Sequence, residues 1–230
     1  MTASPLPGAT VEGTTHRRDL LPVAARAVWP ELPVLALGSV LVALPALAAL
    51  LLGGGVTPLT PLLLAVLCGP PWAALVACTN AIVLEGASGP ARLWREVHRH
   101  WTDGLRLMAV PGVACALCLA DLAVYRARPG TAALLPLTVA CVVTGCTALL
   151  AVVALPLRVE TGLRGRVLWF SAGAVVTSRP LLAPGVLALG YLSLQLSTAV
   201  FASLLLLVPG PLALVVSAGT WSSSAARRHT

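Results

Sequence analysis

Few residues of this chain could do chemistry, and the first two, Asp121 and Asn80, interrupt long apolar stretches. Asp121 is the only carboxylate inside any of those stretches, and an acid within a membrane is a default candidate for proton or ion transport. It lies close to Arg126 and Arg128, near the end of its stretch, so a paired anchor at the membrane boundary is the simpler interpretation. For Asn80, a hydrogen bond between two helices is a simpler role than ligand binding.

Cys115 and Cys118 have the CxxC spacing that carries redox chemistry in thioredoxin-like folds. Here they lie in an apolar stretch without the alternating strand and helix pattern of such folds, so we expect them to be small packing side chains. All six cysteines lie in apolar stretches: Cys68, Cys78, Cys115, Cys118, Cys141 and Cys146. We therefore expect neither a disulfide framework nor a zinc site.

His98 and His100 are two residues apart, so on a helix they point to different faces and cannot bind one metal ion together. We expect both to face solvent or lipid headgroups. The chain also lacks the G-x-S-x-G, H-E-x-x-H and P-loop patterns. The sequence therefore predicts no catalytic residue, no metal site and no cofactor.

The composition is that of a polytopic membrane protein. Hydrophobic residues make up 58% of the 230 residues and charged residues only 10%, against about 25% in soluble domains. The net charge of +7 comes from arginine alone, since the chain has no lysine. Aromatic residues are too sparse, at 4%, for a base-stacking surface. We expect no nucleic-acid partner, and the basic excess is typical of membrane topology.

The longest charged run, residues 91–106, lies between apolar stretches and has a helical period. One face collects Leu93, Trp94, Val97, Trp101, Leu105 and Met108. The other collects most of Arg92, Arg95, Glu96, Arg99, Asp103 and Arg106. This pattern predicts an amphipathic helix on the cytoplasmic membrane surface, with Trp94, Arg95, Arg99, Trp101 and Arg106 at the headgroup boundary. A surface helix of a soluble domain, a calmodulin target or a nucleic-acid patch fits the apolar flanks less well.

The apolar stretches predict an all-α domain, residues 16–221, with six membrane spans. The expected spans are 32–52, 61–84, 105–124, 131–157, 181–198 and 202–219. Gly69-Pro70-Pro71 should interrupt the second span. Outside the spans we expect a disordered tail at 1–15, a juxtamembrane segment at 16–29, a second interfacial helix at 167–179 and a polar tail at 222–230. The alternative for 181–221 is one span plus a re-entrant segment.

The arginines test this topology. With six spans, all of them except Arg126 and Arg128 fall on one side of the membrane. The positive-inside rule then places both termini and both interfacial helices in the cytoplasm. We therefore expect a multi-pass protein of the bacterial plasma membrane.

The segment 67–75, Leu-Cys-Gly-Pro-Pro-Trp-Ala-Ala-Leu, resembles the Gly-Pro-x-x-Ala-Ala motif of the YesL-like family of bacterial membrane proteins through Gly69, Pro70, Ala73 and Ala74. In that family an aromatic, arginine-rich helix follows, similar to the helix with Trp94 and Arg95 here. The family usually carries Phe where this helix has Trp. The resemblance implies no catalytic residues. It does imply a link to transport, because family members often sit beside carbohydrate ABC systems.

Three functions follow from these patterns. The first is a non-enzymatic accessory of a transport system, or a small permease, with transporter subunits and the bilayer as partners. The second is a structural protein that shapes the membrane with its amphipathic helices. The third is a membrane-embedded lipid enzyme, for which Asp121, Asn80 and Gln195 are too few and too scattered.

Overall fold

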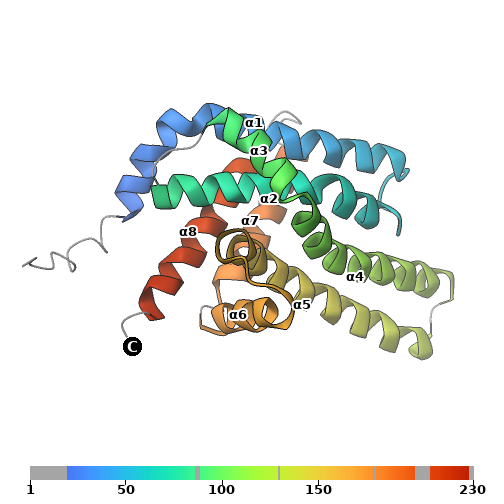
Figure 1. Ribbon diagram of the computed structural model, residues 1–230. Helices are drawn as coiled ribbons and strands as arrows, with labels where there is room; N and C mark the ends of the chain where they lie inside the picture. The colour runs from blue at the N-terminus through green and yellow to red at the C-terminus, as the bar shows by residue number, and fades with distance from the viewer. Residues whose placement is uncertain (1–19, 86–88, 129, 179, 200–207, 228–230) are drawn as a thin grey trace, which may run out of the picture.

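The structure, a computed structural model, describes residues 20–85, 89–128, 130–178, 180–199 and 208–227 (Figure 1). These segments form eight α-helices and contain no strand. The helices are α1 (Leu20–Leu52), α2 (Thr60–Glu85), α3 (Pro90–Arg99), α4 (Trp101–Ala127), α5 (Thr131–Thr161), α6 (Gly165–Ser178), α7 (Leu182–Ala199) and α8 (Pro209–Arg227). The predicted all-α fold is confirmed. The tail expected at 1–15 lies outside the described residues.

Glycine in a left-handed conformation ends two of the long helices. Gly55 has φ +100° in the turn after α1, a region that side chains with a Cβ rarely adopt. The Thr57 hydroxyl donates to the Gly53 carbonyl oxygen at 2.9 Å and holds the same turn. Gly162, with φ +67°, caps α5 and donates its N–H to the Arg158 carbonyl oxygen at 3.0 Å.

Three helices differ from the sequence prediction in extent. α1 joins the expected juxtamembrane segment to the first span in one helix. α2 is one helix through Pro70 and Pro71, so the expected interruption is wrong. α8 continues to Arg227 and takes in most of the expected polar tail. In α2 the two prolines are buried, so neighbouring helices enclose them, which a local pattern does not contain.

α2 lies at the centre of the bundle, between α1 and the pair of α4 and α5, with α8 across it (Figure 1). Its fully buried residues include Leu75, Val76 and Ile82. The main core adds side chains from five other helices: Leu35, Val42, Leu107, Val153, Leu155, Leu168, Val175 and Ala213. α4 and α5 form a hairpin that extends from this core to one side (Figure 1).

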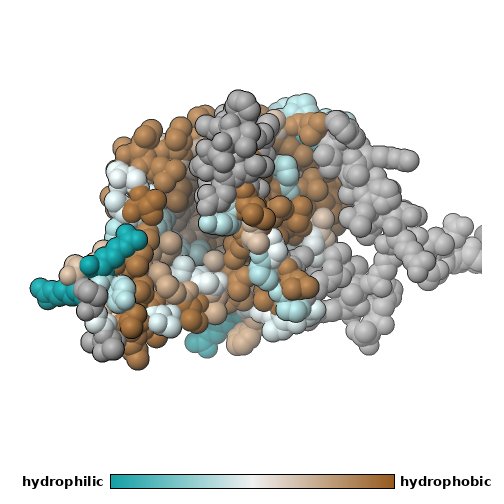
Figure 2. Space-filling view, turned by 180° about the vertical axis from the view of Figure 1, so that it is seen from behind, coloured by the Kyte–Doolittle hydropathy of each residue, from teal (hydrophilic) through white to brown (hydrophobic). Residues whose placement is uncertain are grey.

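Much of the outer surface is apolar, as a membrane protein requires. The most apolar part of α2 is 61% buried, but that of α4 and of α5 is only 17% buried. Leu135, Val139 and Val142 of α5 are exposed, and Figure 2 shows a face that is mostly hydrophobic over the described residues. Soluble monomers rarely expose so large an apolar surface, so lipid is the environment that suits it.

Four of the described helices are long and apolar enough to cross a membrane: Pro30–Leu52, Thr60–Leu84, Trp101–Ala127 and Ala133–Thr161. They correspond to the first four predicted spans. α7 and α8 have 18 and 19 residues, and their crossing of the membrane remains a prediction. The chain is therefore consistent with an integral membrane protein of at least these four candidate spans.

Candidate functional site

α3 lies on the surface of the bundle and is fixed by two apolar side chains. Leu93 and Val97 are buried against Ala74 and Cys78 of α2. Pro90 opens the helix, where no intrahelical donor is needed. The opposite side of α3 faces outward, with Arg95 and Arg99 exposed.

Trp94 and Trp101, which the sequence pattern placed with the apolar face, are 63% and 52% exposed. Both therefore lie at the edge of the buried stripe and project from the protein. The His98 ring contacts the Trp94 ring edge-on, with 5.1 Å between centroids. Arg106 of α4 is also exposed. We use the name α3 face for these exposed aromatic and basic residues of α3 and of the start of α4: Trp94, Arg95, Arg99, Trp101 and Arg106.

The expected continuous helix over 91–106 breaks at His100. This residue has φ −103° and ψ 14°, which ends α3 and begins α4. Its N–H still donates to the Glu96 carbonyl oxygen at 2.9 Å. In Figure 1 α3 lies over α1 and α2, and α4 continues from the end of α3 into the hairpin with α5.

A group of four charged or titratable side chains, the junction cluster, lies at this break: Glu96, His100, Asp103 and Arg158. The Arg158 guanidinium donates to Asp103 Oδ1 at 2.7 Å, which joins the end of α5 to the start of α4. It also donates to the carbonyl oxygens of Gly162 and Leu163, at 2.6 and 2.8 Å. Arg158 thus ties α4, α5 and the loop before α6 together while its own charge is buried.

His100 extends the junction cluster to α3. Its Nε2 lies 3.2 Å from Glu96 Oε2, and its Nδ1 lies 3.7 Å from Asp103 Oδ2. Both His100 and Glu96 are only 8% exposed. The expectations of a solvated His100 and of Glu96 on the polar face are therefore wrong, because both side chains fall at three- and four-residue steps from Leu93 and Val97, on the buried side of α3. His98, in contrast, is exposed.

The motif residues of the second span are packing residues. Gly69, Pro70, Ala73 and Ala74 are all buried. A Cβ on Gly69 would lie 2.9 Å from the Gly104 carbonyl oxygen, so the two backbones touch where α2 crosses α4. Side chains larger than hydrogen do not fit at this crossing.

Asn80 and Asp121 have different surroundings. Asn80 is buried and donates from Nδ2 to the Pro156 carbonyl oxygen at 3.2 Å, which links α2 to α5. The sequence pattern favoured this role. Asp121 is partly exposed on α4, and the expected pairing with Arg126 or Arg128 does not occur among the described residues. The two side chains therefore do not share a site.

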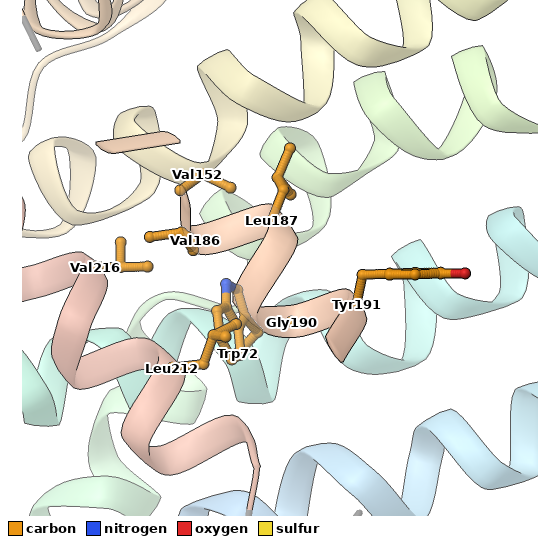
Figure 3. A pocket seen from close by; sticks show the side chains of 8 residues that line it. All are labelled: Trp72, Val152, Val186, Leu187, Gly190, Tyr191, Leu212 and Val216. Atoms are coloured by element: carbon orange, nitrogen blue, oxygen red, sulfur yellow. The ribbon is translucent and has the colours of Figure 1, made fainter. Parts of the chain in front are cut away.

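Trp72 of α2 lines two apolar cavities. One, of about 250 Å³, is bounded by α2, α5, α7 and α8 (Figure 3). In this view Leu212 and Gly190 lie beside the Trp72 ring, whereas the Tyr191 ring extends away from it. The other, of about 450 Å³, is bounded by α1, α2, α4 and α5, and it includes Val42, Met108 and Cys115. Nearly all of the lining is hydrocarbon.

The sequence indicates some members of the junction cluster but not Arg158, and it does not indicate the role of Trp72. Glu96 and His100 are four residues apart and His100 and Asp103 three, so an inward-facing helical triad could have been considered. Arg158 lies 55 residues from Asp103, and no local spacing connects them. Trp72 lies inside the Gly-Pro-x-x-Ala-Ala segment, but nothing in the sequence indicates that it lines two cavities.

The described residues contain no group of three His, Cys, Asp or Glu side chains that could hold a metal ion. The described residues instead form the exposed aromatic and basic α3 face, and the buried ionic contacts of the junction cluster lie beneath it. Comparison with known proteins gave no match to a family model, a curated protein or a solved structure.

Proposed function

We propose that this chain is a six-span protein of the bacterial plasma membrane with both termini and the α3 face in the cytoplasm. It acts without catalysis as an accessory of a transport system and uses the α3 face to contact the transporter. The arginine distribution motivates the orientation. The resemblance of residues 67–75 to the YesL-like family, with its implied carbohydrate ABC systems, motivates the link to transport.

The main observation behind the proposal is that buried contacts with α2, α4 and α5 hold the α3 face in place. Leu93 and Val97 fix α3 to α2, and the junction cluster fixes its end to α4 and α5. Exposed arginine and tryptophan are enriched in the contact surfaces of protein complexes. A preorganised surface of this kind loses little conformational entropy when a partner binds.

The two cavities favour an accessory over a carbohydrate permease. A sugar pathway needs hydrogen-bonding groups to replace water around the hydroxyls. The cavities beside Trp72 have almost wholly apolar linings, and Asp121 and Asn80 lie apart from them. The described helices thus offer a polar solute few partners.

Affinity purification from a mild detergent tests this function. The wild type should recover permease, ATPase or solute-binding subunits. Arg95→Glu with Arg99→Glu should lower that recovery about tenfold, equivalent to roughly 1.4 kcal/mol of binding free energy. The matched control is Arg126→Glu with Arg128→Glu, exposed arginines at the other end of α4, which should leave recovery unchanged. Absence of any transport subunit with the wild type would contradict the proposal.

The exposure of Trp94 and Trp101 also supports a second candidate, a protein that shapes the membrane by inserting these rings at the headgroup level. Replacing both with serine should then alter lipid order in reconstituted vesicles while solute uptake by cells stays normal. Loss of uptake without a change in lipid order would instead favour the transport accessory.

A further inference from the structure

The α4–α5 hairpin holds two thiols from different helices in contact. The Sγ atoms of Cys118 and Cys141 lie 3.3 Å apart, and both cysteines are free. Cys118 is nine residues before the end of α4 at Ala127, and Cys141 ten residues after the start of α5 at Thr131. At about 1.5 Å of rise per residue, both lie about 15 Å from the tip of the hairpin. The helices therefore place the two thiols at the same depth.

We propose that Cys118 and Cys141 form a reversible disulfide that joins α4 to α5, and that a lipid-soluble quinone is the oxidant. A disulfide needs about 2.05 Å between sulfurs. The two thiols must therefore approach by roughly 1.2 Å from their present separation. CxxC spacing pairs Cys118 with Cys115 along the same helix, whereas the folded hairpin pairs it with Cys141.

The surroundings of the pair determine the class of oxidant. Cys141 is exposed, and so are the neighbouring Leu117 and Val142. Both helices are among those long and apolar enough to cross a membrane, so this exposed surface faces lipid. A charged oxidant such as glutathione disulfide is excluded from that phase, whereas a quinone dissolves in it.

The reaction is a balanced two-electron exchange. The two thiols lose two electrons and two protons as the sulfur–sulfur bond forms. The quinone accepts both electrons and both protons and leaves as the hydroquinone. A dithiol that enters the same site reverses the reaction by thiol–disulfide exchange. The covalent bond closes a loop of 23 residues and fixes the hairpin, which otherwise depends on side-chain packing.

Arg126 lies between the two cysteines, so tryptic digestion tests the bond directly. The full chain in proteoliposomes is treated with a short-chain ubiquinone, blocked with N-ethylmaleimide, and digested in denaturant without reductant. Residues 107–126 should then remain joined to the peptide that carries Cys141. The joined mass should be two hydrogens below the sum of the two peptides with N-ethylmaleimide on Cys115 and Cys146 and free thiols at Cys118 and Cys141. Reductant should separate them, and one hydroquinone should form per chain.

Variants make the test specific. Cys118→Ser and Cys141→Ser should each abolish the joined peptide, and Cys146→Ser, which removes another exposed cysteine of α5, should retain it. A joined peptide that persists in Cys118→Ser would overturn the assignment of Cys118 to the pair. A covalent dimer of two chains before digestion would show that the disulfide forms between chains and would also overturn it. Separate peptides in the quinone-treated wild type would overturn the disulfide. Equally fast oxidation by glutathione disulfide would overturn the lipid-phase oxidant.

Discussion

Arg158 connects more of the structure than any other residue of the junction cluster. Its guanidinium reaches Asp103 on α4 and two carbonyl oxygens after α5. A buried ion pair contributes little by comparison with a well-packed apolar pair, but removal of one partner leaves the other charge buried and alone. The effect of losing Arg158 is therefore larger than the strength of its contacts suggests.

We predict that Arg158→Ala destabilises the protein by about 3 kcal/mol, at the lower end of values for broken buried pairs because Asp103 retains some exposure. The free energy of unfolding in detergent measures this. Asp103→Asn added to Arg158→Ala should cost little more, since the pair is already broken.

Arg164→Ala is the matched control, because Arg164 is exposed on the loop that Arg158 holds. It should change stability by no more than about 0.5 kcal/mol. Equal effects of the two substitutions would show that the buried contacts of Arg158 contribute nothing specific.

The decisive contact between helices is the crossing of α2 and α4. Gly69 and Gly104 bring the two backbones together, and Gly112 meets Ala65 and the Pro61 carbonyl oxygen two turns farther along α4. Small residues allow this approach, which increases dispersion contacts between helices where water cannot drive association. The crossing also places Trp101 and the α3 face at the end of α2 that carries Asn80.

We predict opposite signs for two Gly→Ala substitutions. In Gly104→Ala the new methyl would lie 2.9 Å from the Ala73 Cβ and closer still to the Gly69 carbonyl oxygen, so the helices must separate, at about 1–3 kcal/mol. In Gly145→Ala on α5 the methyl meets no atom within 4 Å, so helix propensity should stabilise the protein by about 0.5–1 kcal/mol. Thermal unfolding of both variants in one detergent compares them. Destabilisation by both would contradict the close crossing.

The whole molecule combines a buried central helix with an apolar exterior, and the predicted topology places all its arginines except Arg126 and Arg128 at one end of the spans. α2 is enclosed by its neighbours, and α4 and α5 expose most of their apolar surface. So large an apolar surface would aggregate in water. In lipid, the predicted six-span topology places the guanidinium groups at the membrane boundary. Orientation then follows from the cytoplasmic preference of arginine.

Alkaline phosphatase fusions test this orientation. We predict that an enzyme fused after Thr230 is inactive, because six spans return the chain to the cytoplasm. An insertion between α4 and α5, after Arg128, should be active because it lies outside the cell. Activity after Thr230 would support a single span plus a re-entrant segment in 181–221 and would remove the six-span topology.

Local patterns in the sequence predicted a substantial part of the fold. The lengths of the apolar stretches anticipated α5, α6 and α7 to within a few residues. Asn80 was expected to bridge two helices, and it does so between α2 and α5. These features depend on composition and on the period of one helix, both of which the chain carries locally.

Three-dimensional packing decided the rest. The partners of Arg158 and Cys118 are 55 and 23 residues away, and only the meeting of α4 with α5 joins them. The packing of α3 on α2 buried Glu96 and His100 on the same side as Leu93 and Val97, and it left Trp94 and Trp101 exposed. A sequence can specify which side chains are apolar and how they repeat along one helix. Which neighbour each side chain contacts depends on how several helices pack at once, and that is a property of the folded whole.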